Sequence, residues 1–263
     1  MHNQVVRESY ASACIKAVEE IEIGDQLIIR PRALMAVGGE VEAPSKGSIV
    51  GEGMLGFSGN LSAENKSDAQ NAFLLATLAA NKQYPLEHQG KEWYLLFRET
   101  MIKTGWMPVS KYYNDLKVEG TSVRMDKLVL DILASAVAGV ALPGPATALM
   151  LKVAADAISA LQKRDTTALT TYERNLLENG VGGVSAAACV EVGDEPVMAV
   201  GAVRFLRRNT STKVLFVDVD VRNVNLYRGE TVFTKNQLVA DATREAIKKK
   251  LTPHDSKIED IDI

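Results

Sequence analysis

The most apolar stretch of the chain covers residues 125–161 and carries no charged side chain from residue 132 to residue 151. Its apolar positions recur every three or four residues on both sides of a Pro143-Gly144-Pro145 break, which is the spacing of one face of a helix. Pro145 suits the first turn of a helix, where its missing N–H has no partner to lose. The pattern predicts two helices joined by a tight turn, and this hairpin is either core or the part that meets lipid.

Other patterns give the remaining elements. Helical spacing predicts a helix over residues 5–20, and a capping box of Ser67 with Gln70 predicts the start of a second helix. The segment of residues 91–106 predicts a third helix, which Gly105 ends. From residue 184 onward apolar positions alternate with period two, as in strands. Strands are predicted over 184–192, 196–206 and 214–221, followed by a helix over 237–251.

Helices thus precede an antiparallel sheet, and this order predicts an α+β (α/β) fold. We expect one globular domain over residues 1–251, with the antiparallel sheet of the last third packed against helices that include the apolar hairpin. Residues 252–263 are acidic and are predicted to form a flexible tail.

Composition narrows the classes of function. The 263 residues are 46% hydrophobic and 24% charged, and a net charge of −3 gives no basic field for nucleic acid. The N-terminus has no basic segment before an apolar run, so no Sec signal peptide is predicted. We expect a protein that is cytoplasmic on synthesis, with later release or membrane association left open. Each arm of the hairpin is shorter than the ~20 residues that a spanning helix needs.

The sequence shows no nucleotide loop, metal cluster or paired nucleophile and base, so the expectation is no enzyme, no metal and no required cofactor. Cys189 is the residue of most interest. As a nucleophile it would need His88 or His254 as its base. As a buried thiol it would be a small hydrophobe. As an acylated thiol it would hold a fatty chain beside small neighbours such as Ala187.

One family resemblance bears on this choice. Trp93-Tyr94, Gly105-Trp106, MDKLVLDIL at 125–133, a lone strand cysteine at 189, MAVGAVRF at 198–205 and KVLFVDV at 213–219 resemble the Erwinia virulence factor family over roughly residues 65 to 250. The resemblance implies an α/β single domain, a role in bacterial persistence in the insect gut, and a thioester-linked palmitate on Cys189. Candidate residues for the acyl groove, besides Ala187, are Leu133, Val137, Leu149 and Val153 of the hairpin.

Two hypotheses of different class follow. The first is a non-enzymatic, toxin-like virulence factor that interacts with lipid or a membrane surface and carries the acyl chain on Cys189. The second is a pore-forming or cytolytic toxin that inserts the hairpin of residues 125–161. A third hypothesis is a self-assembling structural protein. Formation of homo-oligomers is kept as an alternative.

Overall fold

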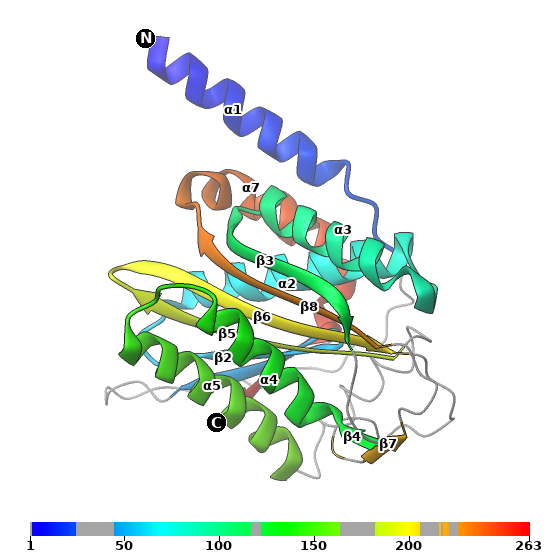
Figure 1. The fold of residues 1–263 in the computed structure, drawn as a ribbon. Coiled ribbons are helices and arrows are strands. Elements are labelled where there is room, and N and C mark those ends of the chain that lie inside the picture. The colour runs from blue at the N-terminus through cyan, green and yellow to red at the C-terminus, as the bar shows by residue number, and fades with distance from the viewer. Residues whose placement is uncertain are drawn as a thin grey trace.

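A seven-stranded sheet divides the protein into three layers (Figure 1). The computed structural model describes residues 2–24, 45–116, 122–163, 182–205, 216, 218–220 and 226–263. The helices are α1 (His2–Glu19), α2 (Ala63–Gln83), α3 (Gly90–Lys103), α4 (Met125–Ala138), α5 (Gly144–Lys163) and α7 (Gln237–Leu251), with short 3-10 turns η1 (Glu87–Gln89) and η2 (Thr252–Lys257). The strands are β1 (Lys46–Val50), β2 (Gly53–Phe57), β3 (Trp106–Leu116), β4 (Ser122–Arg124), β5 (Gly182–Val192), β6 (Glu195–Phe205), β7 (Asp218–Asp220), β8 (Leu226–Lys235) and β9 (Ile258–Asp262).

The sheet has the order β3-β8-β6-β5-β2-β1-β9, and β4 and β7 form a separate pair. Its strands come from both halves of the chain, so the sheet is not confined to the last third as predicted. It is also mixed, because β2 pairs with β5 in parallel while the other pairings are antiparallel. The Gly-rich segment that supplies β1 and β2 gives a weak strand pattern, which explains why the sequence placed the sheet later. The predicted α+β fold of one domain is nevertheless confirmed.

The hairpin prediction is confirmed in its main features. α4 and α5 lie together on one face of the sheet (Figure 1), with the break at residues 139–143. Pro145 stands in the first turn of α5, and the N–H of Thr147 donates to the carbonyl of Pro143 at 3.0 Å. Both helices reach the sheet closely at glycines. A Cβ on Gly201 of β6 would lie 2.8 Å from the backbone nitrogen of Leu133, and one on Gly56 of β2 would overlap the carbonyl of Val153.

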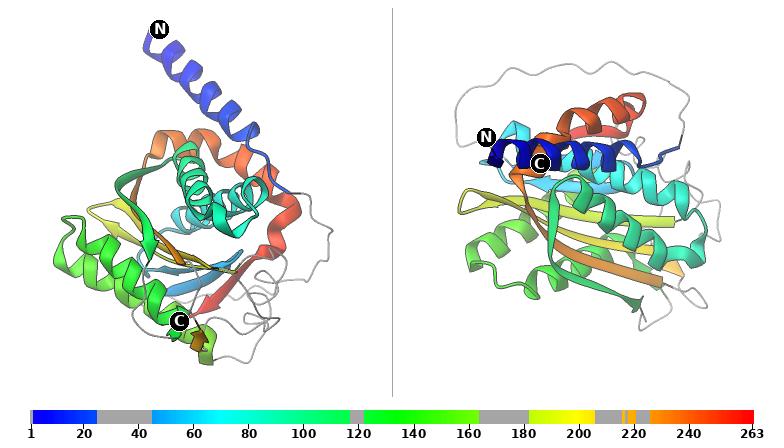
Figure 2. Two further views of the ribbon diagram at one scale, coloured as in Figure 1. Left: turned by 45° about the vertical axis from the view of Figure 1, so that its right-hand side comes forward. Right: turned by 90° about the horizontal axis from the view of Figure 1, so that it is seen from above.

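The opposite face of the sheet is covered by α2, α3 and α7, and α1 runs alongside α7 at the outside of this layer (Figure 2). α2 begins earlier than predicted, because Ser62 accepts a hydrogen bond from the N–H of Asn65 at 3.1 Å and so caps the helix. α3 ends before Gly105, whose φ of 96° ends the helix as predicted. The predicted helix over 237–251 is confirmed as α7.

The prediction of a flexible tail over residues 252–263 is wrong. These residues form η2 and then β9, which pairs antiparallel with β1 at the edge of the sheet. Ile261 is buried in the sheet face under the hairpin, and Asp260 accepts hydrogen bonds from Ser48 at 2.5 Å and Gln70 at 2.7 Å. The prediction rested on the acidic composition and took no account of Ile258 and Ile261. These two side chains point to opposite faces of the strand and pack there.

Candidate functional site

Cys189 lies in the middle layer, on the sheet face that α2 and α3 cover. Together with Ala187 it belongs to a core cluster that includes Phe57, Phe73 and Phe97. The side chain is 1% exposed, and burial raises the pKa of the thiol well above its usual range. A thiol held neutral in this way is a poor nucleophile. In this fold Cys189 is a core residue, and its acylation stays a prediction.

The other candidate residues for an acyl groove lie on the opposite face of the sheet. Leu133, Val137 and Val153 are buried between the hairpin and the sheet, and Leu149 packs at the border of the same cluster. The expectation that these hairpin residues line a groove around Cys189 is therefore wrong in its geometry, because the sheet itself separates them. A thioester-linked chain on Cys189 would lie among the side chains of α2 and α3 instead.

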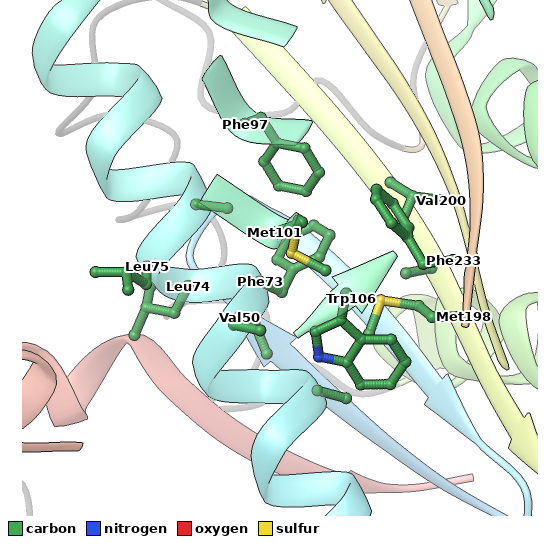
Figure 3. Close-up of a cluster of buried hydrophobic side chains, with 14 of the residues drawn as sticks. Val50, Phe73, Leu74, Leu75, Phe97, Met101, Trp106, Met198, Val200 and Phe233 are labelled. Atoms are coloured by element: carbon green, nitrogen blue, oxygen red, sulfur yellow. The ribbon is translucent and has the colours of Figure 1, made fainter. Parts of the chain in front are cut away.

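Figure 3 shows how this second cluster is filled. Phe73, Phe97, Met101, Trp106 and Phe233 converge between α2, α3 and the sheet. The rings of Phe73 and Phe97 meet edge to face with centroids 5.2 Å apart, and Phe97 stacks on Trp93 with centroids 5.4 Å apart. Two shallow hollows on this side of the described structure are lined by residues that include Asp68 and Arg244 in one and Trp93 and Arg204 in the other, and Cys189 lines neither.

The sequence analysis did not predict the buried ion pairs on this side of the sheet. Arg204, near the end of β6, donates to Glu52 at 2.9 Å, and both side chains are almost fully buried. The guanidinium also lies 4.4 Å from the ring centre of Trp93. Glu52 stands in the turn between β1 and β2, so the partners are 152 residues apart and no local pattern could reveal them.

A second polar cluster joins α2, β8 and α7. Asp68 accepts hydrogen bonds from Arg244 and forms a 2.7 Å ion pair with Lys235. Burial raises the pKa of Asp68, but the hydrogen bonds from Arg244 and Lys235 outweigh it and lower the pKa below its usual range. This cluster holds elements together. Among the described residues no group of three or more metal-ligating side chains occurs.

The part of the predicted hairpin that is open to solvent is its tip, where α4 connects to α5. Val137 of α4 and Met150 of α5 are buried, whereas every residue from 138 to 149 is exposed or only partly buried. None of these twelve positions carries a charge. We call residues 138–149 the hairpin tip. Its apolar side chains include Val140, Leu142 and Leu149.

α5 continues this apolar character along its length. Among the described helices, the segment Gly144–Gln162 has the length and composition that could cross a membrane, and one third of its most apolar window is buried, 33%. Core helices of soluble proteins meet the same criteria of length and composition. The first six residues of α5 are less buried than the middle of the helix, where Met150, Val153 and Ala154 are buried.

Comparisons with known proteins give fold-level likeness only. No protein-family model and no curated protein match the chain. Among solved structures, the Evf virulence factor is similar with a TM-score of 0.33 and 13% identity, over 80% of this chain and 83% of that chain. A delta-endotoxin is similar with a TM-score of 0.30 and 10% identity, over 80% of this chain and 89% of that chain. Likeness at this level assigns no family and carries no function.

Proposed function

We propose that this protein is a non-enzymatic, lipid-interacting factor that contacts a membrane surface through the hairpin tip. The observation that carries the proposal is a run of twelve consecutive uncharged residues between two packed helices, of which seven are exposed and five are half-buried. Contiguous exposed apolar surface commonly marks a site of membrane or protein contact. Of these two, the turn and first helical turn of an apolar helix favour lipid, because the tip offers no charged group to orient a protein partner.

The base of the hairpin favours contact without release from the sheet. Val129, Ile132 and Leu133 of α4 are buried, as are Val153 and Ile158 of α5. Exposing each such side chain costs about 1.5–3 kcal/mol. The tip carries a smaller cost, because seven of its residues are exposed and Val140, Leu142 and Leu149 are only half-buried at the edge of the hydrophobic cluster. Partial insertion of residues 138–149 therefore needs local movement of these side chains but no release of the hairpin base.

Binding to phosphatidylcholine vesicles tests the proposal. Ala148→Asp places a carboxylate on the exposed side of the tip, and Ala13→Asp makes the same change at an exposed position of α1. A charge moved into the apolar layer of a bilayer costs up to about 2.5–3.5 kcal/mol at its centre. We expect Ala148→Asp to weaken vesicle binding about tenfold or more and Ala13→Asp to leave it unchanged. Equal binding by both variants would contradict the proposal.

A pore-forming toxin is the second candidate function, and the length of α5 favours it. Insertion across the bilayer requires the hairpin to leave the sheet, whereas surface contact does not. Release of a trapped dye from the same vesicles separates the two functions. Binding without release supports surface contact, and release that Ala148→Asp abolishes supports the pore.

Acylation of Cys189 is a separate proposal, and it rests on the sequence resemblance. The mass of the intact protein from its native host, before and after hydroxylamine, tests it directly. A hydroxylamine-sensitive adduct of palmitate size that Cys189→Ser removes would support the thioester. The bare sequence mass, with Cys14 and Cys189 both titrating as thiols after unfolding, would contradict it. The virulence role that the resemblance implies also stays a prediction.

A further inference from the structure

The hairpin tip shares one end of the sheet with the turn between β5 and β6. α4 crosses β6 at Gly201, where an added Cβ would lie 2.8 Å from the backbone nitrogen of Leu133. Figures 1 and 2 both show the α4–α5 connection at the same end as this β5–β6 turn. Gly193 and Asp194 both have positive φ, 57° and 66°, so the turn is a tight two-residue connection whose position is fixed by the strands.

Acidic side chains dominate this turn. Asp194 and Glu195 are both exposed at the turn, whereas Glu191 is half-buried and shares the face of Cys189, away from the hairpin. No basic residue interrupts them between residues 182 and 203. The tip therefore approaches any surface with a local negative charge beside it.

Described cations near the turn do not cancel this charge. Lys235 of β8 follows Thr234, the register partner of Val197, and is paired with Asp68 at 2.7 Å. Lys152 of α5 is paired with Asp156 at 2.6 Å. Lys46 begins β1, which is separated from β5 by β2, or by about 10 Å at the usual strand spacing. That separation is about one Debye length at 0.1 M ionic strength, so Lys46 is largely screened from the turn.

The depth of contact keeps the acidic turn at the level of the headgroups. The part of α5 within the hairpin tip, Gly144 to Leu149, is six residues long and mixes exposed and half-buried positions, and it spans about 9 Å at 1.5 Å per residue. Helices that lie in a membrane interface bury their apolar face to about 5–10 Å. At this depth Glu195 and Asp194 stay outside the hydrocarbon and face the polar groups of the lipid.

From this arrangement we infer that the hairpin tip selects a zwitterionic, phosphocholine-type bilayer surface over an anionic one. The inference rests on the proposed lipid contact of the tip. The outermost group of a phosphocholine lipid is a cation, which carboxylates attract. Anionic lipids give a negative surface potential, which raises binding about fivefold for each basic residue nearby and opposes acidic residues in the same way.

Two sets of vesicles test the selection, phosphatidylcholine alone and phosphatidylcholine mixed with phosphatidylserine. We expect the wild-type protein to bind the first at least fivefold more tightly at low salt, and we expect the difference to shrink at high salt because it is electrostatic. Asp194→Lys/Glu195→Lys should abolish or reverse the preference. Glu92→Lys/Glu245→Lys, which changes the net charge equally on exposed helical positions of the other layer, should keep it.

Each outcome decides one of the two proposals. If the wild-type protein prefers the phosphatidylserine vesicles or shows no preference, while Ala148→Asp still weakens its binding, the tip contacts lipid and the inference of selection is wrong. If Asp194→Lys/Glu195→Lys keeps its fold by circular dichroism and also keeps the wild-type preference, the acidic turn is not the cause and the inference is again wrong. If the wild-type protein binds neither kind of vesicle, the proposed function itself fails.

Discussion

The two faces of the central sheet pack against different kinds of side chain. The face under α2, α3 and α7 is rich in aromatic residues, among them Trp93, Phe97 and Trp106. The hydrophobic cluster of buried residues under α4 and α5 contains only aliphatic side chains and methionine, and Ser135 of α4 donates a hydrogen bond to the buried Glu230 of β8 at 3.2 Å. Buried ion pairs also join elements on the aromatic side, as between Glu52 and Arg204. The aromatic layer thus has many specific contacts that fix it, whereas the hairpin layer depends on close aliphatic packing and leaves its tip open.

This difference between the two layers indicates which of them can bind a partner. Aromatic pairs and buried charges contribute directional contacts in addition to apolar burial. A layer held in that way has little freedom to contact a new partner. The hairpin layer keeps its base buried and presents the tip to solvent, so binding can be added there without loss of the core.

The largest effect is expected in the aromatic layer. Phe97→Ala removes a ring that contacts Phe73, Trp93 and Tyr94, and such changes cost about 3–5 kcal/mol of unfolding free energy. Chemical denaturation measures this loss. Leu95→Ala on the same helix is the control, because Leu95 is 40% exposed and exposed substitutions stay within about 0.5 kcal/mol. A small loss in Phe97→Ala would contradict the description of this layer as the more fixed one.

Within the hairpin, the base should respond more strongly than the tip. Leu133 is fully buried against β6, so Leu133→Ala should cost about 2–5 kcal/mol. Leu149 is only partly buried, so Leu149→Ala should cost clearly less while it weakens vesicle binding. Chemical denaturation measures the stability of the two variants, and co-sedimentation with vesicles measures their binding. Equal loss of stability would show that the tip is packed as tightly as the base.

A smaller effect is expected where α5 meets the sheet. Gly56→Ala would place a methyl group against the backbone of Val153, and overpacking of this kind costs about 1–3 kcal/mol. We expect faster amide hydrogen exchange in α5 than in α3 of this variant, because the strain falls on the hairpin. Gly144→Ala is the control, since no atom lies within 4 Å of its added Cβ. Uniform exchange in both layers would argue against separate behaviour of the two faces.

The acid response should be the mildest effect and should arise in the aromatic layer. For Asp260, burial raises the pKa, but hydrogen bonds from Lys66 and Ser48 lower it on balance, and the pKa of Asp68 is lowered as well. A carboxyl whose pKa is lowered by folding stabilises the fold above its ordinary pKa near 3.9. That stability is lost as the pH falls through the lower value in the folded protein.

Unfolding free energies measured from neutral to acidic pH check this expectation. Asp68→Asn should be less stable than the wild-type protein at neutral pH, and its stability should fall less on acidification. A variant with an unchanged acid slope would show that Asp68 contributes nothing to the pH dependence. β9 should loosen in the same acidic range, because Asp260 ties it to α2 through Gln70.

The sequence by itself determined the local elements. Helical spacing located α1, α3 and α7, the Pro-Gly-Pro break located the hairpin, and alternation located β5 and β6. Each of these signals has a period of two or of 3.6 residues and is therefore contained within a short window. Alternation also put Cys189 and Val190 on opposite faces of one strand, and the structure agrees.

Only the tertiary structure decided which helices cover which face. The hairpin packs on the side of Val190, so Cys189 faces α2 and α3 and is separated from Leu133 and Val153. The tertiary structure also placed β9 beside β1, across 212 residues between Ser48 and Asp260, and the acidic turn at Asp194 beside the hairpin tip. The physical reason is that a strand's pattern fixes its two faces but not their partners. The partners are chosen by contacts between residues far apart in the chain, where burial and pairing of the whole set are optimised together.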